Sequence, residues 1–430
     1  MEALQRERAE IDRIDGELAR LFEERMAAAA RIGAEKRAQG LPIRDPAREE
    51  QVLARNLRRV GDPALRPHFA RVLETLMAES RAWQGEEPPA RQAIPRSPAL
   101  PPVLLRRGAL GEAGTVLPPQ GRVFLVTDDG IPPSCVGTLA GQCRSCVVYS
   151  VPQGESSKSP ERLTELLSAM LAAGLTRSDC VAALGGGVVC DLAGLAAGLY
   201  MRGIDCYYFP STLLAMLDAA LGGKTAINLE GVKNAVGLFR QPRAVVIDPE
   251  LLETLPPRQR ANGLAEAVKM ALTHDAALFA RFEDPAGYGD IEEIIAACLR
   301  IKSAVVAADQ QEAGLRRVLN FGHTLGHGLE AAAEGELFHG ECVALGMLPM
   351  CAPPLRERLR AVLERLELPT YVNFNEINPE RVMASVVHDK KAGPEGCIES
   401  VFVPEPGRFE FCRRAPEELR ALLLTLGKGN

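Results

Sequence analysis

The sequence lacks the features that mark membrane and secreted proteins. No apolar run approaches the roughly 20 residues that a membrane-spanning helix needs, and the first residues, MEALQRERAE, are charged at once and lack the apolar core of a signal peptide. We therefore expect a cytoplasmic protein without a membrane partner. The formal net charge of −6 at pH 7 also argues against a general nucleic-acid-binding face.

Disulfides are not expected either. The chain has eleven cysteines, an odd number, and most lie in apolar segments, which is typical of reduced, buried thiols. The one Cys-x-x-Cys pair, Cys143 and Cys146, has no second pair to complete a zinc knuckle, so we interpret it as incidental. What the chain does have is length: 430 residues, 47% of them hydrophobic, are enough for two or three domains.

One proline-rich stretch, residues 85–102, interrupts the periodic apolar pattern and is predicted to be a linker. Three helices are predicted before it. The first covers roughly residues 4–38, the second begins with Asp45 as N-cap and Pro46 as first helical residue, and the third ends near Trp83. The first helix would span about 50 Å, too long for two short neighbours to cover, so a second copy of the chain is the expected partner.

Several cations fall on the apolar face of the first predicted helix. Arg25 and Lys36 lie in the middle of this face and Arg8 lies at its edge. Buried charges are costly unless paired, so convergent cations with few acids indicate a small dicarboxylate held by arginine forks. The alternative is that these side chains reach solvent or pair internally.

The segments IDRIDGELARLFEERMAAAARIGAEKRAQGLPIRDPAREE and MAESRAWQ resemble the all-helical chorismate mutases, which are intertwined dimers. The resemblance implies a Claisen rearrangement of chorismate, which needs a compact conformer and stabilisation of charge on the ether oxygen. It implies that the substrate carboxylates are held by Arg8 (in the partner's site), Arg25, Arg48 and Ser80. The ether oxygen would be bonded by Lys36 and Gln84, and the ring hydroxyl by Glu49 and Asp45.

After the linker, strands and helices alternate. The segments RVFLVTDDG, CRSCVVYSVP, CVAALGGGVV, DCYYFPST and RAVVIDPE are predicted strands, with a helix near 159–173. This alternation predicts a parallel, Rossmann-like sheet. From about residue 258 the pattern is mostly helical.

Two stretches of the α/β region are typical of phosphate binding. ALGGGVVCDLAG leads from a strand through three glycines into a helix, where backbone N–H groups can hold a pyrophosphate. A plain tight turn is the alternative. Lys224, Lys233 and Asn234 lie among apolar and glycine residues and suit a sugar phosphate, although a solvated surface would also explain them.

The histidines suggest a metal site. His323 and His327 share a helical face in LNFGHTLGHGLE, His339 follows shortly, and Glu266 and Lys269 share a face of another helix. Two histidines and one carboxylate would form a three-ligand zinc site with an open, catalytic position. Spacing alone leaves open which two histidines bind, and an isolated pair four residues apart is more often packing than metal.

Residues 103–430 resemble 3-dehydroquinate synthase, one of the sugar-phosphate cyclases related to iron-type alcohol and glycerol dehydrogenases. GGGVVCDLAG, GGKTAIN, KNAVG, GLAEAVK, LNFGHTLGHGLE, HGE and HDKK match that family in order. The resemblance implies that Glu266, His323 and His339 hold a divalent metal, with zinc favoured over cobalt. His327 would then work beside the substrate phosphate and in proton transfer.

The resemblance also implies two larger sets of site residues. NAD would be bound by Asp128, Glu155, Lys158, Gly186, Gly187, Asp191, Ser211, Thr212, Asp218, Lys233, Thr254 and Leu255. The substrate would be bound by Lys224, Asn234, Lys269, Lys302, Arg316, Asn320 and Lys390, with Arg202 reaching the phosphate in a neighbouring subunit. The implied reaction converts 3-deoxy-D-arabino-heptulosonate 7-phosphate (DAHP) to 3-dehydroquinate, and NAD is regenerated in each turnover.

The sequence therefore predicts a multidomain, bifunctional enzyme of the shikimate pathway. An all-α three-helix chorismate mutase-like domain (1–84) and a linker (85–102) would precede an α/β Rossmann-like NAD domain (103–257) and an α-helical metal- and substrate-binding domain (258–430). The alternatives are a cyclase for another sugar phosphate, a polyol dehydrogenase, or a helical domain that senses chorismate or prephenate, or only dimerises. Two departures from the synthase pattern are Gln259, in place of a glutamate, and a segment after Met350 that is shorter by about ten residues.

Overall fold

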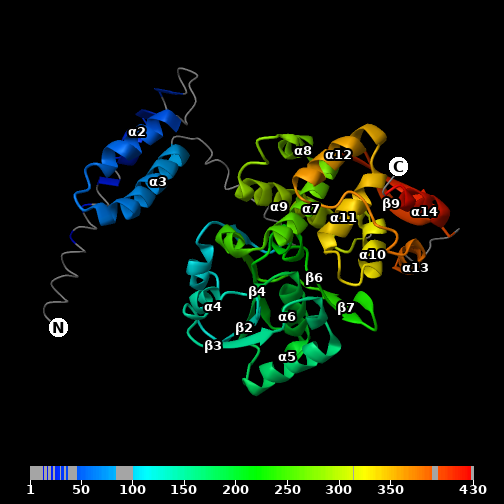
Figure 1. Ribbon diagram of the computed structural model, residues 1–430. Helices are drawn as coiled ribbons and strands as arrows, with labels where there is room; N and C mark the ends of the chain where they lie inside the picture. The colour runs from blue at the N-terminus through cyan, green and yellow to red at the C-terminus, as the bar shows by residue number, and fades with distance from the viewer. Residues whose placement is uncertain are drawn as a thin grey trace. The chain divides into compact units, whose positions relative to one another are not determined.

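The computed structural model divides into two compact units, residues 1–93 and 94–430, and each is described by itself (Figure 1). The residues described are 13, 17, 21, 22, 25–29, 31, 32, 35, 36, 46–83, 100–312, 314–389 and 396–427. Within these residues, no helix combines the length and apolar character needed to cross a membrane.

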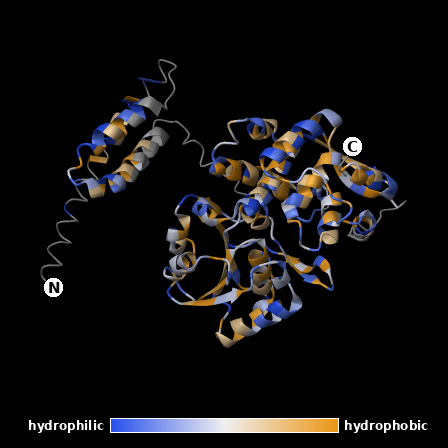
Figure 2. Cartoon of the chain, viewed as in Figure 1, coloured by the Kyte–Doolittle hydropathy of each residue, from blue (hydrophilic) through white to orange (hydrophobic). Residues whose placement is uncertain are grey.

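The N-terminal unit is helical throughout most of its described part. Every described residue between positions 13 and 36 is in a helix. Helix α2 (Pro46–Leu57) begins at Pro46 as predicted, and the short 3-10 helix η1 (Pro63–Leu65) leads into α3 (Arg66–Trp83). Helices α2 and α3 lie side by side in contact (Figure 1). Hydrophobic and hydrophilic residues are interspersed along α2 (Figure 2), as expected for a helix with one apolar face.

The second unit is built on a six-stranded parallel sheet. Its strands, in the spatial order β1-β8-β5-β4-β2-β3, are β1 (Val103–Leu105), β8 (Ala244–Ile247), β5 (Asp205–Pro210), β4 (Cys180–Gly185), β2 (Val123–Asp128) and β3 (Cys146–Val151). The five predicted strands are confirmed, and β1 was missed because it is only three residues long. The strand order reverses between β2 and β4, and ligands of such sheets bind at the carboxyl ends beside the reversal.

Both faces of the central strands of this sheet are buried. In β2, Val123 and Leu125 face one apolar cluster, which includes residues of η2 (Ala109–Thr115) and α4 (Pro133–Ala140), whereas Phe124 and Val126 face the other. The second cluster is covered by α5 (Pro160–Ala172) and α6 (Gly187–Leu199). Burial on both faces explains why the central strands β2, β4 and β5 are almost continuously hydrophobic in sequence.

Four short helical elements follow strands or helices of the α/β part. They are η3 (Glu155–Ser157), η4 (Tyr200–Arg202), the single-turn π-helix η5 (Ala215–Ala219) and η6 (Pro249–Thr254). The strands β6 (Lys224–Leu229) and β7 (Val232–Phe239) form a separate antiparallel hairpin. Every residue of β7 is exposed. The hairpin was not predicted.

The C-terminal half is mostly helical, as predicted. Its elements are α7 (Pro257–His274), α8 (Ala276–Glu283), α9 (Ile291–Ala308), η7 (Leu315–Asn320), α10 (His323–Ala332), α11 (His339–Met347), η8 (Leu348–Met350), α12 (Pro353–Arg365), α13 (Pro379–Asp389), β9 (Ile398–Glu405), β10 (Arg408–Arg414) and α14 (Pro416–Leu424). The β9–β10 hairpin was not predicted. Helix α7 is the centre of this half, because residues 261–273 are all buried.

Glycines let α10 and α11 approach each other closely. A Cβ on Gly346 of α11 would lie 2.0 Å from the carbonyl oxygen of Gly322, and one on Gly326 of α10 would lie 3.0 Å from that of Cys342. Gly322 also has φ +78°, which disfavours any residue with a side chain. The glycines around the histidine pair therefore serve close packing of α10, which carries His323 and His327, against α11, which carries His339.

Candidate active site

Three side chains from three helices meet in the helical half. Glu266 comes from α7, His323 is the first residue of α10, and His339 is the first residue of α11. The Nε2 atoms of His323 and His339 each lie 3.6 Å from Oε1 of Glu266. One donor atom from each side chain lies within 4.8 Å of the others, which suits a single metal ion.

Both imidazoles present Nε2 to Glu266. Nδ1 of His323 lies 3.1 Å from the carbonyl oxygen of Phe321, so Nδ1–H donates there and Nε2 keeps its lone pair. Burial, helped by the charge of Lys269, lowers the pKa of His323 well below its usual value. His323 is therefore neutral near pH 7, as a metal ligand must be.

Glu266 is a buried anion that requires a cation. It is fully buried, and neither carboxylate oxygen has a hydrogen-bond donor of suitable geometry among the described residues. Lys269, one turn further along α7, forms an ion pair with Oε2. Burial alone would raise the pKa of Glu266, but Lys269 and His339 outweigh it and lower the pKa. An ionised carboxylate beside two Nε2 atoms fits a divalent metal ion.

His327 lies next to this group. Its ring centroid is 5.1 Å from that of His323 and 5.9 Å from that of His339. Together with Glu330 and His339, His327 also forms a second set of donors within 4.8 Å of one another. Geometry alone therefore does not choose between the two sets, and the assignment of Glu266, His323 and His339 as ligands stays a prediction.

Besides Lys269, two predicted substrate-binding cations of this unit are buried. Nζ of Lys302 donates to Asp218, at 2.6 Å to Oδ1 and 2.5 Å to the carbonyl oxygen. Burial lowers the pKa of Lys302, and Asp218 opposes this shift. Arg316 donates to the carbonyl oxygens of Gln310 (2.7 Å) and Gly222 (3.1 Å). Asp218, which was predicted to bind NAD, thus lies in contact with Lys302, which was predicted to bind the substrate.

The sequence reasoning missed Glu312. Its carboxylate pairs with Lys224 and accepts a hydrogen bond of 2.8 Å from Nδ2 of Asn320. It therefore joins two residues predicted to hold substrate, which lie 88 and 8 residues away in sequence. Its backbone has φ +59°, which is unfavourable for glutamate. The only signal in the sequence was its place four residues before Arg316.

The glycine turn lies where the strand order reverses. β4 ends at Gly185, Gly186 caps α6 without a side-chain hydrogen bond, and Gly187 begins the helix. A Cβ on Gly186 would lie 3.2 Å from Thr212, and Ser211 donates its N–H to the carbonyl of Gly185 (2.9 Å). Predicted NAD-binding residues from two segments therefore meet at a helix N-terminus, which favours a pyrophosphate.

Lys158 connects further predicted residues. Its buried Nζ donates to Asp191 Oδ2 (2.8 Å) and Asn234 Oδ1 (2.5 Å). Burial raises the pKa of Asp191 to about 6, and Lys158 opposes the rise. Glu155 accepts a hydrogen bond of 2.8 Å from Asn228 in the hairpin. These contacts link the α/β core to the β6–β7 hairpin.

The other predicted residues of this unit lie as follows. Asp128 ends β2, Thr254 is exposed at the end of η6, Leu255 is partly buried, and Arg202 is exposed with φ +67°. Lys233 pairs with Glu330, with Nζ 2.6 Å from Oε1. Lys390 lies outside the described residues.

In the N-terminal unit, Arg25 reaches across to α3. Its Nη1 donates to the carbonyl oxygen of Leu76 (2.8 Å) and to the hydroxyl of the buried Ser80. Burial lowers the pKa of Arg25. Two residues predicted for the substrate carboxylates are thus in contact. Lys36 and Glu49 are partly buried and Arg48 is exposed, whereas Arg8, Asp45 and Gln84 lie outside the described residues.

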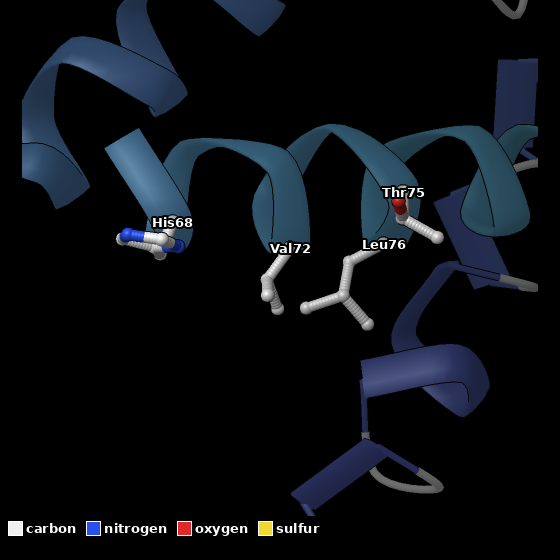
Figure 3. A pocket seen from close by; sticks show the side chains of 4 residues that line it. All are labelled: His68, Val72, Thr75 and Leu76. Carbon is white, nitrogen blue, oxygen red and sulfur yellow. The ribbon is translucent and has the colours of Figure 1, made fainter. Parts of the chain in front are cut away.

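A separate hollow of about 470 Å³ lies on α3, lined by His68, Val72, Thr75 and Leu76. The side chains of His68, Val72 and Leu76 point to the same side of the helix (Figure 3). None of the lining residues belongs to a predicted site.

Comparison with known proteins assigns both units. Residues 7–85 match chorismate mutase type II, and residues 148–262 and 263–392 match the N-terminal and C-terminal parts of 3-dehydroquinate synthase. The 3-dehydroquinate synthase of Rhodospirillum rubrum is 40% identical over 356 residues, which cover 76% of this chain and 91% of the relative. That of Latilactobacillus sakei is 42% identical over 283 residues, covering 63% and 79%.

The chain belongs to the 3-dehydroquinate synthase family and carries a type II chorismate mutase domain. The predicted fusion of two enzyme domains is thereby confirmed. Among solved structures, the synthase unit resembles 2-epi-5-epi-valiolone synthase from Streptomyces hygroscopicus with NAD+ and Zn2+ bound, at 28% identity and a TM-score of 0.68. The match covers 76% of this chain and 96% of that one. A probable glycerol dehydrogenase from Sinorhizobium meliloti shares the fold at 18% identity, with a TM-score of 0.52 over 77% and 98% of the chains.

Proposed function

We propose that the synthase unit converts DAHP to 3-dehydroquinate with release of phosphate, and that the N-terminal unit rearranges chorismate to prephenate. The observation that carries the first activity is that Glu266, His323 and His339 lie close enough to bind one metal ion. The same unit also buries Lys302 and Arg316, which are cations suited to a phosphate or carboxylate. Relatives about 40% identical are named 3-dehydroquinate synthase, which favours DAHP over the substrate of the 28%-identical valiolone synthase.

The unit would bind a divalent metal and NAD. Glu266, His323 and His339 would hold the metal, with zinc favoured, and the turn at Gly186 and Gly187 would hold the NAD pyrophosphate. The valiolone synthase with both NAD+ and Zn2+ bound supports this assignment. When bound, the metal polarises a substrate oxygen, and NAD takes up and returns a hydride.

The cations of the site would hold the substrate anions. Lys302 and Arg316 are buried and already fixed by Asp218 and by backbone carbonyls, so they need little reorganisation when a phosphate or carboxylate arrives. The further residues proposed to bind substrate are Lys224, Asn234, Asn320 and Lys390. His327 and Lys269 lie beside the metal candidates and would move protons to and from the substrate.

The N-terminal unit would act without a nucleophile. Arg25 and Ser80 are in contact and would share one substrate carboxylate, and the proposed partners of the second carboxylate are Arg8 and Arg48. Lys36 and Gln84 would stabilise negative charge on the ether oxygen, and Glu49 and Asp45 would bond the ring hydroxyl. Arg8 and Arg202 would each serve the site of a second copy, so a homodimer or higher homo-oligomer is part of the proposal.

The test measures both reactions on the full-length protein. Phosphate release from DAHP, with NAD and zinc present, should vanish in Glu266→Gln while chorismate consumption stays within about twofold of wild type. Arg25→Ala should show the reverse pattern, with chorismate turnover reduced at least 100-fold, since one lost transition-state contact of this kind costs about 10²–10³.

Three outcomes would contradict the proposal. If Arg25→Ala turns over chorismate like the wild type, the mutase assignment is wrong. If the wild type binds chorismate without consuming it, the N-terminal unit is a sensor. If another sugar phosphate is cyclised faster than DAHP, the substrate assignment is wrong.

A further inference from the structure

Glu330 is an acidic residue beside the proposed metal ligands. It lies on α10, three residues after His327 and seven after His323, so it shares a helical face with both. Its side chain is only 13% exposed. A charge held this far from water needs partners, and the structure provides two.

The first partner is His339. Oε2 of Glu330 lies 3.1 Å from Nδ1 of His339, while Nε2 of the same ring lies 3.6 Å from Oε1 of Glu266. Since a carboxylate only accepts, Nδ1–H of His339 donates to Glu330. The ring is thereby held with Nε2 directed at Glu266.

The second partner is Lys233 on strand β7. Its Nζ lies 2.6 Å from Oε1 of Glu330. Each carboxylate oxygen thus has its own partner, one from the β6–β7 hairpin and one from α11. This arrangement fixes the carboxylate in position while it holds the imidazole.

The backbone around His339 is also fixed. Glu341 accepts two hydrogen bonds from Arg258 (2.6 and 2.8 Å) and one from the N–H of Phe338 (2.8 Å). The N–H of Gly340 donates to Asn262 at 2.6 Å. With the start of α11 anchored, rotation of the His339 side chain is the main freedom left, and Glu330 restricts it.

We propose that Glu330 is a positioning residue that orients His339 for metal binding, with Lys233 holding its carboxylate in place. This inference rests on the proposed metal site at Glu266, His323 and His339. A carboxylate behind a metal-binding histidine fixes its tautomer and makes the ring a better ligand, and losing it typically weakens metal affinity about 10–100-fold.

The test uses the full-length protein, stripped of metal and titrated with zinc alone against a competing chelator. Glu330→Ala should weaken zinc affinity about 10–100-fold. Glu330→Gln, whose amide oxygen can still accept from Nδ1–H, should lose less. Glu334→Ala is the matched control, because Glu334 is exposed and pairs with Arg381 rather than with a histidine; its zinc affinity should equal that of the wild type.

A spectroscopic measurement distinguishes a role of Glu330 in orienting His339 from a general role in folding. The visible absorption of the cobalt-loaded protein reports ligand geometry, so Glu330→Ala should change it and Glu334→Ala should not. Should Glu330→Ala fail to fold, Glu330→Leu, which keeps similar volume but cannot accept from Nδ1–H, decides: unchanged zinc affinity and an unchanged cobalt spectrum would overturn the proposal.

Further variants separate the role of Glu330 from the metal site itself. If His339→Ala weakens zinc binding but Glu330→Ala does not, the role of Glu330 is wrong and the metal site stands. If neither Glu266→Gln nor His339→Ala weakens it, the metal site itself is wrong. If the wild type binds two zinc ions and Glu330→Ala loses one, Glu330 is a ligand of a second ion and the positioning role is overturned.

Discussion

At the scale of single residues, the site is built from buried charges, and most of their partners lie far away in sequence. Glu266 and Lys269 are nearly inaccessible to solvent and pair with each other. Buried Lys302 pairs with Asp218, and the largely buried Glu330 pairs with the exposed Lys233. Breaking a buried pair by removing one member leaves an uncompensated charge, which costs far more than the pair itself contributes.

Lys269→Met tests this for the metal-free protein. We expect the synthase unit to lose about 3–5 kcal/mol of stability, since Glu266 would remain buried without its cation. Zinc should restore part of the loss by supplying positive charge. Urea unfolding with a chelator and with zinc measures both effects, and Glu266→Gln/Lys269→Met should be less destabilised than Lys269→Met. Equal stability of Lys269→Met and wild type would contradict the prediction.

Asp191 gives a pH dependence. Burial raises its pKa to about 6, whereas an aspartate in an unfolded chain titrates near about 3.9. The folded state therefore binds this proton more tightly, so the contribution of Asp191 to stability is greatest below about pH 4 and falls as pH rises toward about 6.

Asp191→Asn removes that dependence. The difference in unfolding free energy between wild type and variant should fall by on the order of 2 kcal/mol from about pH 4 to about pH 6 and then level off. Denaturant unfolding at several pH values measures it. A difference that rises with pH, or does not change, would show that Asp191 is not protonated in this range.

At the scale of elements, helix contact decides the site more than helix propensity does. Glycines are poor helix formers, yet Gly326 and Gly346 lie inside α10 and α11 because a Cβ would meet the backbone of the other helix or of the turn before it. This contact sets how closely α10, which begins at His323, packs against α11, which begins at His339.

Gly346→Ala should therefore destabilise the synthase unit. The new Cβ would lie 2.0 Å from the carbonyl oxygen of Gly322, and overpacking of this kind costs about 1–3 kcal/mol or more. Gly137→Ala is the matched control, since Gly137 is an exposed helical glycine with open space around its Cβ position. That variant should be neutral or up to about 1 kcal/mol more stable. Thermal unfolding compares the two, and similar effects from both would refute the packing argument.

Sequence patterns predicted the regular elements well where apolar runs were long or residues typical of a helix start were present. The five predicted strands, α5 and the start of α2 at Pro46 are confirmed. The two hairpins were missed: β7 is exposed along its whole length, so no buried face marks it, and β9–β10 lies among helices. Glu312 was missed because its importance comes from Lys224, 88 residues away.

At the scale of the whole molecule, two compact units share one chain. If each unit folds as its own cooperative structure, NAD and zinc should stabilise only the synthase unit. At free ligand concentrations about 100 times Kd, linkage predicts about 2.7 kcal/mol for one site. Differential scanning calorimetry should show one transition that rises in temperature and one that does not. A single transition, or two that rise together, would contradict independent folding of the units.

The sequence by itself identified the two enzyme families, because motifs such as LNFGHTLGHGLE are specific over a few residues, and the candidate metal ligands were then implied by the family resemblance. Only the tertiary structure determined which charged side chains form ion pairs with one another. Lys233 and Glu330 are 97 residues apart, and Asp218 and Lys302 are 84 apart. Such pairs depend on how helices and strands pack, and local periodicity carries no information about contacts at that range.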